Sequence, residues 1–304
     1  FELRKIWGKP SFLLSVCVLL AVNLFLMWYI NLPDEGTPPL SAYKAFIEDI
    51  ASMSESEKTD YIDDLKAKVD GIAFVQTIQG MQNMGNEMGA ALAQQEMEAN
   101  PGLFEQYYDL YQSGDYLIYT DSFAKESALI QELYEENSKV SGYTDYLESV
   151  QKNKDSLSGI SIFGSTENFS TRNTQKSAKD YDGLENTEIQ WQPSRGISAA
   201  MENSVTDVLL LLGIFLFVGS LIAEEKEKGL FNITRGTKYG LCVSIWSKLA
   251  ALLIHCFVIT AVMVGGNLVY AELTAGLGNL RVSIESIAPY MESNLQISVL
   301  EYIA

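Results

Sequence analysis

The sequence predicts a mainly α-helical membrane protein with three transmembrane helices and a large, mostly helical extracytoplasmic domain that carries a small β element. Three long apolar stretches lead to this prediction, at 11–32, 205–223 and 249–271. A membrane-spanning helix needs about 20 predominantly apolar residues, and in hydrocarbon its amides must bond within the segment. The net charge of −18 falls on 33–204, where 30 acidic residues face 12 basic ones. We therefore expect that block to lie outside the bilayer.

Residues 1–32 are predicted to form a cytoplasmic start followed by the first transmembrane helix. The run from Ser11 to Leu32 has no charged residue and is longer than the apolar core of a cleaved signal peptide. Bases precede this run and acids follow it: Arg4, Lys5 and Lys9, then Asp34 and Glu35. By the positive-inside rule, the N-terminus is cytoplasmic and the end of this helix is outside.

The block 33–204 is predicted to be an acidic extracytoplasmic helical domain. Apolar residues recur every three or four positions through 41–70 and 72–99, which is helical spacing. Ser54 and Glu57 have the spacing of a capping box, and we expect Gly71 to end the helix that they begin.

The second half of this block predicts one long helix and two short strands. A helical period runs from about 115 to 156, which predicts a stalk of roughly 60 Å. Composition then shifts to β-like, turn-rich sequence at 158–166 and again at 188–193. This part is expected to seat the stalk on the membrane or to contact a partner, and a plain connector is the alternative.

Charge and cysteine content restrict the partners of the acidic block. Such a block repels nucleic acid and anionic headgroups but permits a cation or a cationic peptide as a partner. Acidity that only maintains solubility is the alternative. No disulfide framework is available in it, because the cysteines lie in or beside the apolar stretches: Cys17, Cys242 and Cys256.

Residues 205–271 are predicted to form a transmembrane hairpin around a charged connector at 224–248. The connector holds five bases and three acids close to both spans, which by the positive-inside rule places it in the cytoplasm. The two orientation signals agree, because two crossings, at 11–32 and 205–223, separate the cytoplasmic N-terminus from the cytoplasmic connector and place 33–204 outside.

Four segments resemble the permease subunits of ABC-2 type ATP-binding-cassette transporters of the kind common in Gram-positive bacteria. These segments are Phe1–Trp7, Phe163–Asn173, Pro193–Gly196, and Glu224–Leu230 with Arg235 and Lys238. The resemblance implies six spans per subunit, so 272–304 is expected to be an extracytoplasmic segment that leads to a truncated fourth span. It also implies that the connector contacts a separate cytoplasmic ATPase, and that a second permease subunit, identical or homologous, completes the transporter.

The candidate coupling surface is therefore the connector itself. Its predicted residues are Glu224, Glu225, Lys226, Glu227, Lys228, Gly229, Arg235 and Lys238. A charged segment of mixed sign between two rigid helices can dock in a groove of another protein and transmit a push. The alternative is a solvated helix end that only carries ion pairs along the helix.

No catalytic, cofactor-binding or metal-binding residues are predicted. The sequence has no Walker A loop, so ATP hydrolysis is assigned to a partner and the chain is not itself an enzyme. Polar residues inside spans are functional candidates by default, and a possible intramembrane polar site is formed by His255, Asn267 and Asn23. Hydrogen bonding between neighbouring helices is the alternative role for all three.

The sequence thus predicts a multi-pass permease subunit in the cell membrane of a bacterium, coupling ATP hydrolysis by a separate subunit to substrate export. Its expected partners are the ATPase, a second permease subunit and the lipid bilayer, without nucleic acid. The competing hypothesis is a membrane-anchored extracytoplasmic receptor or surface-interaction protein, in which the spans are only anchors.

Overall fold

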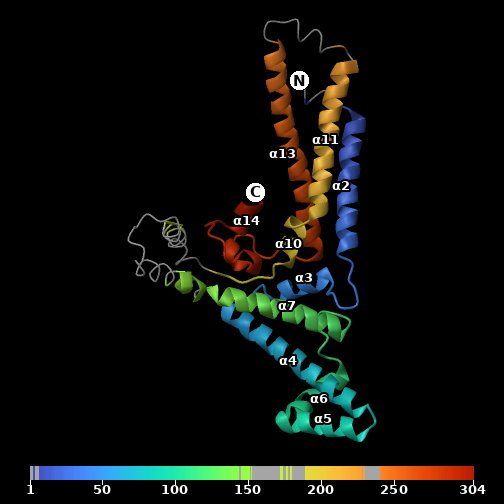
Figure 1. The fold of residues 1–304 in the computed structure, drawn as a ribbon, viewed down its shortest axis with the longest axis vertical. Helices are drawn as coiled ribbons and strands as arrows, with labels where there is room; N and C mark the ends of the chain where they lie inside the picture. The colour runs from blue at the N-terminus through green and yellow to red at the C-terminus, as the bar shows by residue number, and fades with distance from the viewer. Residues whose placement is uncertain are drawn as a thin grey trace. The chain divides into compact units, whose positions relative to one another are not determined.

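The fold is almost entirely helical. The computed structural model describes residues 7–143, 145–150, 189–227 and 240–304, with isolated positions at 3, 152, 172, 173, 176, 179 and 229. Helices make up 76% of the structure, and no sheet forms within these residues (Figure 1). The prediction of a mainly helical protein is confirmed.

The chain divides into two compact units. The first, called here the apolar unit, consists of Phe1–Leu32 and Arg195–Leu277. The second, the acidic unit, consists of Pro33–Ser194 and Gly278–Ala304. The chain therefore passes between the units three times, and the C-terminal segment belongs with the acidic block that precedes it by more than 80 residues in sequence.

The apolar unit extends beyond the predicted hairpin, which had its ends at 205 and 271. Helix α10 (Arg195–Met201) packs against α13 (Gly240–Thr274). At Gly196 an added Cβ would lie 1.9 Å from the carbonyl oxygen of Gly276. Only a glycine allows this approach, so the residues just before the hairpin are part of the apolar unit.

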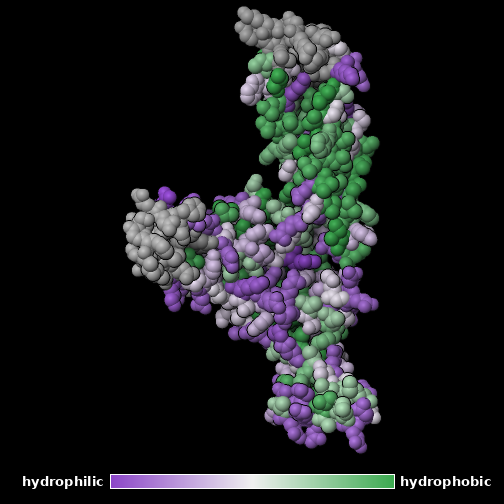
Figure 2. Space-filling view, viewed as in Figure 1, coloured by the Kyte–Doolittle hydropathy of each residue, from purple (hydrophilic) through white to green (hydrophobic). Residues whose placement is uncertain are grey.

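Three helices are long and apolar enough to cross a membrane, as predicted: Pro10–Ile30, Arg195–Ala223 and Cys242–Thr274. They correspond to α2 (Pro10–Ile30), α11 (Ser204–Glu227, preceded by α10) and α13, which lie side by side (Figure 1). Large apolar side chains point outward from each, with Leu14 65%, Phe215 71% and Phe257 74% exposed. Figure 2 shows this apolar surface over the three helices. Such a surface is stable in lipid and not in water, which supports membrane association.

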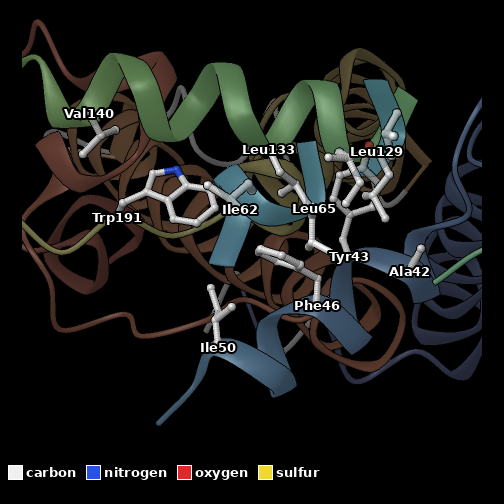
Figure 3. Packing of buried hydrophobic residues seen from close by; sticks show 12 residues of the cluster. Ala42, Tyr43, Phe46, Ile50, Ile62, Leu65, Leu129, Leu133, Val140 and Trp191 are labelled. Atoms are coloured by element: carbon white, nitrogen blue, oxygen red, sulfur yellow. The ribbon is translucent and has the colours of Figure 1, made fainter. Parts of the chain in front are cut away.

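The acidic unit is built around a long central helix. Helix α4 (Glu55–Gln82) packs against α5 (Glu87–Ala99), α6 (Leu103–Ser113) and α7 (Phe123–Ser141). Helix α3 (Leu40–Ile50) joins α4 and α7 in enclosing a hydrophobic core. This core includes Phe46, Ile62, Leu133 and Trp191 (Figure 3). The ring of Phe46 meets that of Trp191 edge to face, with centroids 6.1 Å apart. This unit therefore has a hydrophobic core of its own.

Helix α4 begins as predicted but ends later than predicted. Ser54 and Glu57 form the capping box, with the Ser54 amide donating to the Glu57 carboxylate over 2.8 Å. The prediction that Gly71 ends the helix is wrong. Gly71 is buried in the middle of α4, where a Cβ would lie 2.2 Å from the ring of Tyr107 on α6. The glycine makes room for a neighbouring helix and does not mark a stop.

The predicted helix over 115–156 is also wrong at its start. Residues 114–122 form an irregular loop because the buried carboxylate of Glu126 accepts hydrogen bonds from the amides of Ile118, Tyr119 and Thr120, at 3.2, 3.2 and 2.9 Å. Helix α7 begins only at Phe123 and ends at Ser141, before Gly142. The local bonds from one side chain replace the helical hydrogen bonds that the periodicity favoured.

The predicted small β element is not found in the part that the structure describes. The segment 158–166 lies outside the described residues, and 189–193 is irregular. That second segment is held by hydrogen bonds to side chains. The Trp191 backbone amide donates to the Glu55 carboxylate over 2.8 Å, and the Asn279 backbone amide donates to the side-chain oxygen Oε1 of Gln192 over 2.7 Å. The Asn279 bond, together with the bond from the Gln190 amide to the Ser286 hydroxyl over 3.1 Å, ties 278–304 to the rest of the acidic unit.

The C-terminal segment contains short helices only. They are the 3₁₀ turns η1 (Ile284–Ser286) and η2 (Ala288–Tyr290) and helix α14 (Val299–Ile303). Ser298 caps α14, and an isolated antiparallel bridge joins Ser298 to Ser283. The expectation that a fourth span begins here stays a prediction.

Candidate functional site

A closed ring of hydrogen bonds joins the three apolar helices near one end. The Asn23 amide nitrogen donates to the Asn267 carbonyl oxygen over 2.6 Å, and the Asn267 nitrogen donates to the Thr206 hydroxyl over 2.9 Å. The Thr206 hydroxyl donates to the Asn23 carbonyl oxygen over 2.8 Å, which closes the ring. Each of α2, α11 and α13 thus supplies one member.

The ring is buried, and its hydrogen-bonding groups are almost all paired. Asn23, Thr206 and Asn267 are 0%, 4% and 1% exposed. The Asn267 nitrogen also donates to the Ala200 carbonyl of α10 over 3.1 Å. Each primary amide has two donors and each hydroxyl one, so these bonds use most of what the three side chains offer. None of the three side chains titrates near neutral pH, and their bonds run between helices, which suits them to hold the helices in register.

His255 lies apart from this ring, although the sequence grouped it with Asn23 and Asn267. Its imidazole stacks on Phe217 of α11, with centroids 4.1 Å apart and an interplanar angle of 6°. The rings of Trp7 and Phe12 lie at 5.7 and 5.8 Å. His255 is fully buried, and neither ring nitrogen meets hydrogen-bond geometry with a partner among the described residues.

The polar ring and the aromatic layer, which consists of Trp7, Phe12, Phe217 and His255, lie at different levels along the three apolar helices. From Phe12 to Asn23 on α2 and from His255 to Asn267 on α13, the helical rise separates the aromatic layer from the polar ring by about 16–18 Å. Between them lies an aliphatic layer in which Leu19, Leu209 and Ile259 are buried together. The polar ring joins the helices by directed bonds, whereas the aromatic layer joins them by stacking and apolar contact.

The predicted coupling surface is only partly described. Helix α11 continues through Glu224 and Glu225 to Glu227, beyond its last apolar residues. Lys226, Glu227 and Gly229 are exposed. Lys228, Arg235 and Lys238 lie outside the described residues, and of Glu224 and Glu225 only the helical backbone is described. Helix α13 begins at Gly240, so the predicted connector contains the ends of both helices.

Sequence analysis missed Thr206 as a member of the polar ring. It lies in the first turn of α11, next to Asp207, where a hydroxyl is unremarkable. The available signal was its depth. Thr206 lies near the start of α11, whereas Asn23 and Asn267 lie toward the ends of α2 and α13. If successive spans cross the membrane in opposite directions, as predicted, all three residues lie on the same side of the bilayer centre.

Comparison with protein-family models, with curated proteins and with solved structures gave no match.

Proposed function

We propose that this chain is the membrane-spanning permease subunit of an ABC-2 type transporter, which exports a substrate with work supplied by a separate ATPase. The family-like segments of the sequence support this proposal, together with three helices that are long and apolar enough to cross a membrane. The connector is proposed to be the ATPase docking surface, on the cytoplasmic side. The acidic unit is then extracytoplasmic.

The observation that carries the proposal is the continuity of α11 and α13 with the connector. Helix α11 runs without a break from the polar ring at Thr206 to the charged residues at its other end. Helix α13 has 35 residues, which is about 52 Å of helix and more than a bilayer core requires. A displacement of the connector would therefore reach both ends of the membrane through rigid rods.

Co-purification tests this proposal directly. The tagged chain is solubilised from its native membrane in mild detergent, and the proteins that accompany it are identified by mass spectrometry. The variant Glu225→Lys with Lys228→Glu reverses two charges in the connector and leaves the net charge unchanged. We expect a stoichiometric ATP-binding-cassette ATPase with the wild type, and loss of that ATPase, together with its substrate-stimulated hydrolysis, in the variant.

A matched control exists in the acidic unit. Asp64 and Lys68 form an exposed ion pair four residues apart on α4, so Asp64→Lys with Lys68→Asp exchanges two charges on another helix. This control should retain the ATPase. Equal recovery from the wild type and from the connector variant would contradict the assignment of the connector, and failure to recover any ATPase would contradict the transporter.

The second candidate function is a membrane-anchored receptor. It is favoured by one observation, that the acidic unit has a hydrophobic core of its own around Phe46 and Trp191. In that case the same pull-down should return envelope or extracellular proteins and no ATPase.

A further inference from the structure

Helices α5 and α6 form an end of the acidic unit that is poorly covered. None of the side chains of α6 is buried, and of α5 only Gly89 and Ala93 are buried. Yet α6 is strongly amphipathic, with Leu103, Phe104, Tyr107, Tyr108, Leu110 and Tyr111 among its eleven residues. Tyr107 meets α4 at Gly71, and the remaining apolar side chains are only half-buried. Figure 2 shows apolar residues exposed among polar ones over these two helices.

A surface pocket of about 500 Å³ opens beside these helices. Its apolar lining comes from Ala90, Ala93 and Met97 of α5 and from Phe104 of α6. The carboxylates of Glu98 and Glu105 stand in the same lining. The volume is that of an ordinary ligand site, and methionine adapts its shape to different apolar side chains.

The charge around the pocket identifies the kind of occupant. Between Lys68 and Lys125 the chain has eight carboxylate side chains and no lysine or arginine. The Glu98 carboxylate accepts a hydrogen bond from the Gln94 side chain over 2.8 Å, and this stretch contains no base that could neutralise either pocket carboxylate. A second copy of the chain would bring the same negative charge to the surface, and nucleic acid or an anionic lipid headgroup would be repelled as well. A partner that is both apolar and cationic satisfies the lining and the charge together.

We propose that the pocket between α5 and α6 binds a cationic amphipathic helix. Its apolar face would fill the pocket between Met97 and Phe104, and its lysine or arginine side chains would pair with Glu98 and Glu105. This is the recognition of an amphipathic helix by an apolar groove, with charges at the rim that select the sign of the partner. The proposal does not depend on transport, since a receptor could use the same site.

The test uses the full chain in nanodiscs of zwitterionic lipid and a fluorescein-labelled synthetic helix with leucine on one face and lysine on the other. Fluorescence anisotropy measures binding, with empty nanodiscs as the background. We expect saturable binding that weakens as salt is raised. A peptide of the same composition in scrambled order should bind at least about tenfold more weakly, because it retains the charge and loses the apolar face.

Two pairs of variants locate the site. Met97→Ser and the double variant Glu98→Lys with Glu105→Lys should each weaken binding about tenfold or more. Their matched controls are Met88→Ser, an exposed residue on another flank of α5, and Glu96→Lys with Asp115→Lys, which changes the net charge equally outside the lining. Both controls should bind within about twofold of the wild type.

Three results would overturn the proposal. One is equal binding of the scrambled and amphipathic peptides, which would show attraction by charge alone. Another is equal loss in the pocket variants and their controls. The third is a change of oligomeric state in Met97→Ser without any change in peptide binding, which would identify a second copy of the chain as the occupant. Because the double charge variant alters only exposed residues, a folding defect in Met97→Ser leaves the test intact.

Discussion

Replacing Asn267 by leucine should loosen the three apolar helices without preventing their insertion. The substitution removes three hydrogen bonds, from Asn23, to Thr206 and to the Ala200 carbonyl. Hydrogen bonds between membrane helices average about 0.6 kcal/mol, so their loss costs about 2 kcal/mol. The Asn23 nitrogen is then left with only the Met27 sulfur, at 3.9 Å, and a buried donor without a good acceptor costs about 1 kcal/mol more.

Steric trapping or SDS titration of the full chain in bicelles would measure this loss. We expect Asn267→Leu to lower the free energy of unfolding by about 2–3 kcal/mol. A double-mutant cycle with Asn23→Leu should give a coupling energy of about 1 kcal/mol, because each variant breaks the same bond. Ser220→Ala is the control, since this exposed hydroxyl bonds only to the Leu216 carbonyl of its own helix. A coupling energy near zero would refute the idea that the ring holds the helices together.

Three further predictions concern single side chains. Burial raises the pKa of the Glu136 carboxyl from its usual 4.5 despite hydrogen bonds from Ser194 that lower it. The folded state therefore holds the Glu136 proton more tightly than the unfolded state does. The contribution of this carboxyl to stability is fully present below about 4.5 and is lost as pH rises through the raised pKa. Hydrogen exchange of α7 at a series of pH values should show this loss in the wild type and not in Glu136→Gln. Gly71→Ala should cost about 1–3 kcal/mol and speed exchange in α6, because its Cβ meets a ring at 2.2 Å, whereas Gly80→Ala, with nothing within 4 Å, should stabilise α4 by about 0.5–1 kcal/mol. His255→Phe should raise the thermal stability of the apolar unit, because it removes two buried nitrogens that lack good hydrogen-bond geometry with the described residues; a lower melting temperature would show that the imidazole has an effective hydrogen-bond partner, for which the Gly213 backbone is the candidate.

The spans could be predicted because their signal is one-dimensional. Length and the absence of charge identify α2, α11 and α13 wherever they pack. The partners inside the bundle could not be predicted in the same way. Asn23 and Asn267 are 244 residues apart in sequence. The sequence grouped His255 with them and did not point to Thr206, because the rotation of each helix about its axis decides which side chains face one another.

The errors in the acidic unit have a shared physical form, in which the contact of one side chain overrides the helical periodicity or the stop signal of the sequence. Gly71 follows an aspartate and resembles a helix end, yet the ring of Tyr107 requires that space within a continuous helix. Glu126 lies on a helical stripe of the sequence, yet its buried carboxylate bonds the amides of the preceding loop. In the first case the deciding atoms come from another helix, and in the second from a side chain six to eight residues further along the same predicted helix.

The two layers of the apolar unit would respond differently to a force applied at the connector. Under the proposed function, the ATPase would push on the ends of α11 and α13 that lie beyond the aromatic layer. In the aromatic layer, His255 and Phe217 meet by stacking, which tolerates sliding because no directed bond has to break. At the polar ring, any rotation of one helix breaks at least one hydrogen bond in a dry environment, which is costly. The helices should therefore pivot about Asn23, Thr206 and Asn267, and Asn267→Leu should reduce transport more than it reduces ATP hydrolysis.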